Sequence, residues 1–82
     1  MCLAIPTQVI EITNADAESA LVELDGVKRE VNVALVRQSN QPLSRLIGQW
    51  VIVHAGFAIS VVDEEEALRT LTLMHEMQQE EH

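Results

Sequence analysis

Residues 50–62 have the sequence WVIVHAGFAISVV, and this stretch decides the fold. It contains two apolar runs, 50–54 and 57–62, separated only by Ala55 and Gly56. Strands buried on both faces are near-continuous apolar runs, and a two-residue connection with a glycine is typical of a tight β-hairpin. We therefore predict two antiparallel strands that form the centre of the core.

Three further strands are predicted before this hairpin. Apolar and β-branched residues fill 7–12 and 20–24, and a polar loop lies between them. The dipeptide Asp25-Gly26 is a strong turn signal and precedes an alternating stretch at 27–33. Five short strands without room for crossover helices predict a mainly β protein, an antiparallel barrel or sandwich that is OB-like or SH3-like in size.

The alternation in residues 27–33 defines one face of the third strand. This face carries Val27, Val31 and Val33, with Arg29 beside them. Either Arg29 extends past the edge of the core or it pairs with an acid, and the sequence leaves both open. The polar segment 38–49 is long for a connection in so small a domain, and we predict that it is mobile.

A C-terminal helix is predicted over residues 63–80. Asp63 is a suitable N-cap, and Glu66 stands at the capping-box position. Apolar residues then recur at helical spacing at Leu68, Leu71, Met74 and Met77. This stripe can lie across an open end of the barrel or against a partner, and we expect it to pack on the chain's own barrel. The chain is then a single domain over 1–82, with the barrel at 1–62.

Composition limits the classes of function and partner. The 82 residues carry a net charge of -8 and only two aromatic residues, which disfavours binding to a phosphate backbone or stacking on bases. A lone cysteine excludes an internal disulfide, and no apolar run approaches the roughly 20 residues of a membrane span. We expect a soluble, cytoplasmic protein that binds neither nucleic acid nor membrane.

The single thiol, Cys2, directly follows the initiator Met1. Removal of Met1 would place an α-amine and a thiol on the same residue, and these are two donors for a soft metal. The thiolate is the form that binds metals and attacks electrophiles. Pro6 lacks an N–H donor, so we expect the strand ladder to begin after it and Cys2–Ile5 to project as an unpaired arm. An inert cysteine is the alternative.

His54 ends an apolar strand just before the small-residue turn. It is a candidate metal ligand or proton carrier, or else a structural histidine bonded to a backbone carbonyl. Cys2 and His54 together are too few for a structural zinc site, which needs four protein ligands. Two donors suit a metal that arrives with other ligands or is shared with a second protein. A cysteine–histidine enzyme lacks a recognisable orienting group or oxyanion loop, so we predict no enzymatic activity.

Three stretches resemble one known family. MCLAIP at 1–6, DGVKREVNVALV at 25–36 and GQWVIVHAGFAIS at 48–60 are similar to the HypC/HybG/HupF family of nickel–iron hydrogenase maturation chaperones. The resemblance spans nearly the whole chain except its last dozen residues. Thr7 stands where many members have glycine, and Asp25 stands where some have cysteine.

The resemblance implies an OB-like barrel with a C-terminal helix and a role as a carrier. Members work with a HypD-type iron–sulfur scaffold protein, on which iron acquires cyanide and carbon monoxide. They then accompany that iron fragment to the precursor of the hydrogenase large subunit. A metal-free adaptor that uses Cys2 only for docking is the alternative.

The resemblance also implies which residues form the site. Cys2 would contact the iron and the partner's cysteines, and His54 would lie near that iron. Partner binding is expected at the arm and at the rim of the hairpin. These residues are Cys2, Leu3, Ala4, Ile5, Pro6, His54, Gly56 and Phe57.

Overall fold

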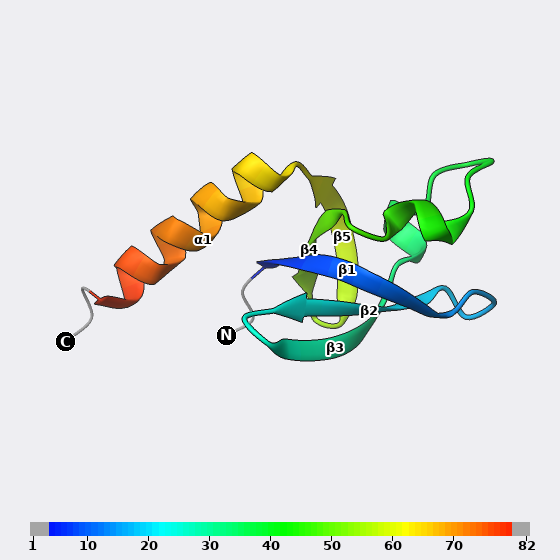
Figure 1. Cartoon of the computed structure of the whole chain (residues 1–82), viewed down its shortest axis with the longest axis horizontal. Coiled ribbons are helices and arrows are strands. Elements are labelled where there is room, and N and C mark those ends of the chain that lie inside the picture. The colour runs from blue at the N-terminus through cyan, green and yellow to red at the C-terminus, as the bar shows by residue number, and fades with distance from the viewer. Residues whose placement is uncertain (1–3, 80–82) are drawn as a thin grey trace.

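The computed structural model describes residues 4–79 (Figure 1). Five strands make up the body of the protein: β1 (Ile5–Asn14), β2 (Ser19–Leu24), β3 (Val27–Asn32), β4 (Trp50–His54) and β5 (Phe57–Val62). Two short 3-10 helices, η1 (Ala34–Val36) and η2 (Leu43–Leu46), connect β3 to β4. The chain then continues into the helix α1 (Glu64–Gln79). The predicted mainly β barrel with a C-terminal helix is confirmed.

The strands form a closed barrel in the order β1-β2-β3-β5-β4, and β1 pairs with both β2 and β4. β1 can serve two neighbours because it is long and bends. Its register with β2 shifts between Val9 and Glu11 and again between Ile12 and Asn14. Such bulges increase the local twist and bend of a strand. The curvature of β1 is therefore what brings β2 and β4 to its two sides.

The barrel is closed much more weakly between β3 and β5. These strands run parallel and share one paired position, Asn32 with Phe57. At this pair the Asn32 N–H donates to the Gly56 carbonyl at 3.0 Å. Elsewhere β5 lies against η1. Apart from Asn32, the residues of β3 are consequently paired on one side only, with β2, among the described residues.

The core consists of small aliphatic side chains from every strand and from both 3-10 helices. Its buried members are Val9, Ala20, Val22, Val31, Val33, Val36, Leu43, Leu46, Val51 and Ala58. The prediction for the third strand is right for Val31 and Val33 and wrong for Val27, which is 57% exposed. Val27 lies on the same face, but no neighbouring strand covers that end of β3. The segment 38–49 also differs from the prediction, because η2 within it buries Leu43 and Leu46.

The helix α1 is capped as predicted. The Glu66 N–H donates to Asp63 Oδ1 at 2.7 Å, which satisfies one of the free amides of the first turn. The helix contacts β1, and one residue from each of these elements, Ala67 and Pro6, is fully buried. After this first contact the helix extends away from the barrel and lengthens the molecule to 46 Å, against 23 and 20 Å across (Figure 1).

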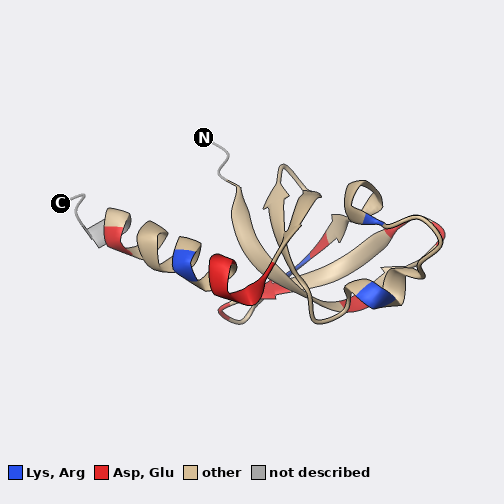
Figure 2. Cartoon of the chain, turned by 90° about the horizontal axis from the view of Figure 1, so that it is seen from above, with Lys and Arg blue, Asp and Glu red and all other residues tan. Residues whose placement is uncertain are grey.

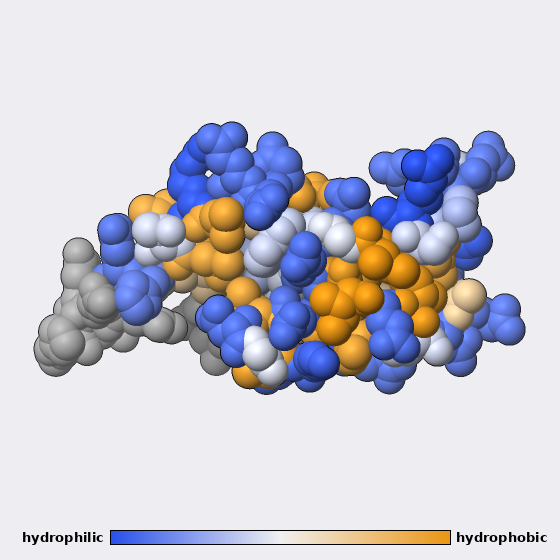
Figure 3. Space-filling view, in the orientation of Figure 1, coloured by the Kyte–Doolittle hydropathy of each residue, from blue (hydrophilic) through white to orange (hydrophobic). Residues whose placement is uncertain are grey.

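The predicted packing of the apolar stripe is therefore largely wrong. Leu68 and Met77 are exposed, at 47% and 63%, while Leu71 and Met74 are half-buried. A helix of 16 residues is about 24 Å long, and only its first turns reach the barrel. Apolar surface is correspondingly visible on α1 as well as on the barrel (Figure 3). No helix among the described residues is long and apolar enough to span a membrane.

Candidate functional site

The N-terminal segment enters the barrel earlier than predicted. Ile5 pairs with Val53 and Pro6 pairs with Ile52, so the ladder with β4 begins at Ile5. The expectation that Ile5 belongs to an unpaired arm is wrong. Proline is tolerated here because the other ladder of β1, with β2, begins only at Gln8, so one side of Pro6 needs no donor. Ala4 is exposed, and Cys2 and Leu3 lie outside the described residues.

The hairpin between β4 and β5 has the tight turn that the sequence predicts. Both turn residues have positive φ, 55° for Ala55 and 85° for Gly56, as a type I′ turn requires. The strands on either side are held in register by the pair of His54 with Phe57. Because partners in an antiparallel ladder point to the same side, the two side chains lie next to each other at the hairpin tip.

The His54 and Phe57 side chains are both accessible. Phe57 is 48% exposed, and His54 is exposed and makes no hydrogen bond or ion pair with residues 4–79. The structural alternative for His54, a bond to a backbone carbonyl, is therefore not found within this range. An exposed imidazole beside an exposed aromatic ring is available to a partner or to a ligand brought by one.

The ladder between β1 and β4 brings the two predicted parts of the site together. Ile5 and Val53 are partners, so Ala4 and His54 each stand one residue beyond the same pair. Residues 4–6 and the hairpin tip thus share one end of the barrel, although some 50 positions separate them in the sequence. No group of three or more potential metal ligands occurs among the described residues. The ligand roles of Cys2 and His54 stay predictions.

A cleft of about 530 Å³ opens at this end of the barrel. Its lining is mainly apolar and comes from β1, the β2–β3 hairpin and the tip of the β4–β5 hairpin. The residues that line it are Ile5, Thr7, Val22, Leu24, Asp25, Val27, Arg29, Val31, Val53, Ala55 and Gly56. Two of the predicted site residues, Ile5 and Gly56, therefore belong to its wall.

Two polar groups in this cleft were not predicted as part of the site. Thr7 Oγ1 is buried and has no hydrogen-bond partner within residues 4–79. Arg29 of β3 is exposed, lines the cleft and forms no ion pair within residues 4–79, not even with Asp25, which also lines the cleft. Of the two options for Arg29, the structure thus favours extension past the core edge. The alternation in 27–33 placed Arg29 on the inner face, but no sequence signal placed Thr7 opposite it.

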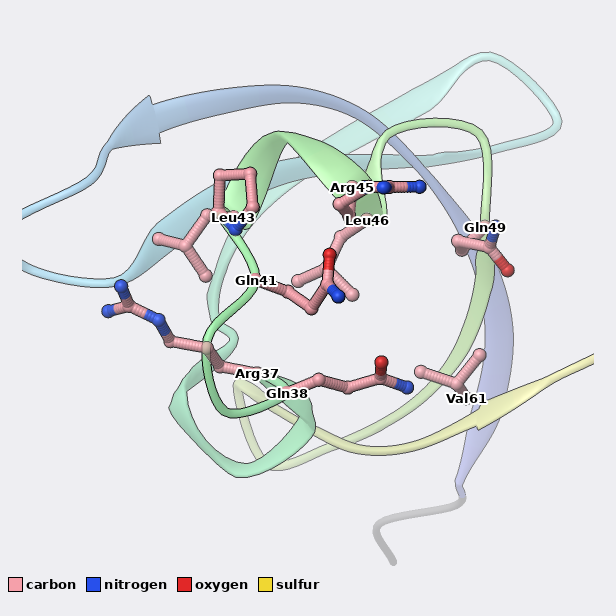
Figure 4. Close-up of a pocket in the computed structure, with 9 residues that line it drawn as sticks. Arg37, Gln38, Gln41, Leu43, Arg45, Leu46, Gln49 and Val61 are labelled. Atoms are coloured by element: carbon pink, nitrogen blue, oxygen red, sulfur yellow. The ribbon is translucent and has the colours of Figure 1, made fainter.

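A second cavity, of about 260 Å³, lies near the other end of the β4–β5 hairpin (Figure 4). It is lined by Arg37, Gln38, Gln41, Pro42, Leu43, Arg45, Leu46, Gln49 and Val61. Arg37 is engaged with Glu18, at 3.2 Å between Nη1 and Oε2. Of the predicted site residues that the structure describes, none lines this cavity.

Charge is distributed unevenly over the elements. Acidic residues gather at the start of α1, where Glu64, Glu65 and Glu66 occupy the first turn (Figure 2). Negative side chains are favourable there because the N-terminal end of a helix carries partial positive charge. This acidic turn follows directly from β5, and none of its three glutamates lines the cleft.

Comparison with known proteins decides the family. A family model described as the HupF/HypC family matches residues 1–74, which is most of the chain. The chain belongs to the HupF/HypC family. The HupF/HypC proteins are maturation chaperones rather than catalysts, so the predictions of family and of a non-enzymatic role are confirmed.

Curated HupF/HypC relatives cover most of the chain as well. Hydrogenase maturation factor HypC of Rhodobacter capsulatus is 48% identical over 94% of this chain and 78% of its own length. Hydrogenase maturation factor HybG of Escherichia coli K12 is 44% identical over 94% of this chain and 92% of its own. Frd operon uncharacterized protein C of Proteus vulgaris is 51% identical over 94% of this chain and 78% of its own length.

Proposed function

We propose that this chain is a hydrogenase maturation chaperone that carries an iron fragment. Together with a HypD-type iron–sulfur scaffold, it holds iron bearing cyanide and carbon monoxide and delivers it to the precursor of the nickel–iron hydrogenase large subunit. We further propose that it works in the cytoplasm, where thiols stay reduced. The observation that carries the proposal is membership of the HupF/HypC family. The sequence adds to it, because its single thiol precedes the segment of β1 that pairs with β4, the strand that ends in His54.

The chemistry of the two donors, a thiolate and an imidazole, suits transient binding of the iron fragment. A thiolate is a soft donor that binds iron strongly, and an imidazole is a second, neutral donor. Two protein ligands leave most of the coordination sphere to cyanide, carbon monoxide and the partner's residues. A site that the protein does not close by itself can release its cargo, whereas a site with four protein ligands retains it. The exposed position of His54 at a hairpin tip permits a partner to approach.

The experiment is co-purification of a C-terminally tagged chain with the HypD-type protein and with the large-subunit precursor. The variant is Cys2→Ala, because alanine at position 2 is also small enough to permit removal of Met1. Leu35→Ala, at an exposed position in η1, is the control. We expect Cys2→Ala to lose both complexes and hydrogenase maturation, and Leu35→Ala to retain them. Undiminished complexes and undiminished hydrogenase activity in Cys2→Ala would contradict the proposal.

Metal analysis of the purified complex separates the carrier from the metal-free adaptor. The carrier predicts iron beyond the content of the scaffold's own cluster, and it predicts that this excess is lost in Cys2→Ser. If the chain is a metal-free adaptor, the complex should contain the same amount of iron as the HypD-type scaffold alone.

A further inference from the structure

One edge of β3 has no partner in residues 4–79. β3 pairs with β2 along its whole length, from Leu24–Val27 to Ser19–Asn32. On its other side only Asn32 is paired, with Phe57 of β5. The edge of β3 from residue 27 to residue 31 is therefore open, next to the cleft. An open edge presents unpaired N–H and C=O groups that can pair with another strand.

The register identifies which backbone groups face this open edge. In an antiparallel hairpin closed by a two-residue turn, the residues that flank the turn form a hydrogen-bonded pair, and such pairs then alternate. Val27, Arg29 and Val31 thus bond to β2, and the bond from the Val33 N–H to the Glu18 carbonyl continues this alternation. The residues between them direct their backbone N–H and C=O groups away from β2. The Asn32 N–H does so, because it bonds to the Gly56 carbonyl.

It follows that Lys28 and Glu30 direct their backbone N–H and C=O groups to the open edge. They offer two donors and two acceptors at the spacing of a β-ladder. The side chains of the alternate residues Val27, Arg29 and Val31 line the adjacent cleft. A strand bound at this edge would pair with residues 28 and 30 and place every second side chain into the cleft.

The cleft determines what such a strand would carry. Its lining is mainly apolar, so apolar side chains fit at the inward positions. Arg29 forms no ion pair within the described residues, so a carboxylate on the bound segment would meet a free guanidinium. Thr7 Oγ1 is buried without a hydrogen-bond partner among the described residues, and a polar atom of the bound segment would relieve that cost.

We propose that an extended segment of the HypD-type partner binds along the open edge of β3 as an added strand. The segment is apolar at alternate positions and carries one acidic side chain for Arg29. The identity of the partner rests on the proposed function. The location supports it, because Ile5 and Gly56, which belong to the predicted partner-binding residues, form part of the same cleft. A scaffold that contacts the N-terminal segment is therefore already at the cleft.

A second copy of this chain is a poorer occupant of the edge. Each copy carries a net charge of -8, so close association of two copies is opposed by their repulsion. A second β3 would also bring a second Arg29 rather than a carboxylate toward the cleft. Charge repulsion and the second Arg29 therefore disfavour self-association at this edge.

Amide hydrogen exchange tests the added strand directly on the wild-type chain. We expect the amides of Lys28 and Glu30 to exchange fast in the free chain and to become at least about tenfold slower in the complex with the HypD-type protein. Amides of Arg29 and Val31, which already bond to β2, are the internal reference. Unchanged exchange at 28 and 30 in a fully formed complex would overturn the inference while leaving the proposed function intact.

Two variants of Lys28 distinguish the contribution of its backbone N–H to binding from that of its side chain. Lys28→Pro and Lys28→Ala both remove the charge, but only proline removes the N–H that faces the open edge, and neither touches the ladder with β2. We expect Lys28→Pro to bind the HypD-type protein about tenfold more weakly than Lys28→Ala. Glu30→Pro and Glu30→Ala repeat the comparison at the second position, in case one proline variant folds poorly.

The remaining outcomes are also decisive. Equal affinity of the proline and alanine variants would overturn the added strand. Protection of residues 28 and 30 that grows with the concentration of the free chain would assign the edge to a second copy, and protection only with the large-subunit precursor would assign it to that partner. Both results contradict the proposal. A wild-type chain that binds no HypD-type protein contradicts the proposed function itself, and with it this inference.

Discussion

Ile5 and Val53 are direct partners in the antiparallel ladder between β1 and β4. This pair joins the start of the described chain to the strand that ends in His54. Residues 4–6 of the first motif and the hairpin tip at His54 are therefore neighbours in space. Ala4, which stands directly before the ladder, is exposed.

We predict that His54→Ala leaves the stability of the free chain within about 0.5 kcal/mol of wild type, because His54 is exposed and makes no hydrogen bond within the described residues. The same variant should carry less iron in the partner complex. Urea denaturation and metal analysis are the measurements, and His54→Gln, which keeps a polar side chain, is the control. A loss of several kcal/mol would show that His54 is structural.

Substitutions in the β4–β5 turn should change the stability of the chain according to how well the new residue tolerates the positive φ at that position. Ala55→Asn is expected to stabilise the chain by about 0.5 kcal/mol, because asparagine tolerates positive φ better than alanine does. Gly56→Ala is expected to destabilise it by about 1 kcal/mol, although an added Cβ at Gly56 meets nothing within 4 Å. Thermal unfolding measures both. Equal stabilities would show that the turn is not held in the type I′ conformation.

Thr7→Val is predicted to stabilise the free chain by about 1 kcal/mol. The substitution keeps the shape of the side chain and removes a buried hydroxyl oxygen that has no hydrogen-bond partner in the described part of the chain. Thr7→Ser, which keeps the hydroxyl and loses the methyl group, should be less stable than wild type. Denaturant unfolding of the three proteins gives the order, and a less stable Thr7→Val would show that the hydroxyl is satisfied in solution.

Asp63→Ala should reduce the helicity of α1 while leaving the barrel folded. The Asp63 carboxylate accepts the Glu66 N–H, and loss of an N-cap costs about 1 kcal/mol. Since only the first turns of α1 contact the barrel, this cost falls on the helix. Far-ultraviolet circular dichroism should fall and the exchange of α1 amides should rise, whereas Asp63→Asn should resemble wild type. Global unfolding of Asp63→Ala would mean that α1 is part of the barrel's stability.

The strands, turns and helix were predictable because each has a local signal. The apolar runs around Ala55-Gly56, the Asp25-Gly26 turn and the Asp63 cap all specify their elements by nearby residues. The errors concern long-range contacts. The sequence did not indicate that η2 turns Leu43 and Leu46 into the core, or that α1 leaves the barrel after Ala67.

The candidate site was predictable only in part, for the same reason. Motif residues such as His54 and Gly56 stand out in the sequence, and the structure places them with Ile5. Thr7 and Arg29 belong to the same cleft only because the barrel brings β1 opposite β3. The single bridge between β3 and β5, which leaves the edge of β3 open, depends on the closure of the whole barrel and has no signature in either strand.

The measurement that tests the central claim most directly is a mid-infrared spectrum of the chain co-purified with its HypD-type partner. A carrier of the iron fragment predicts stretching bands of metal-bound cyanide and carbon monoxide, in a region where protein does not absorb, and their loss in Cys2→Ser. A well-formed wild-type complex whose spectrum is blank in that region would contradict the claim.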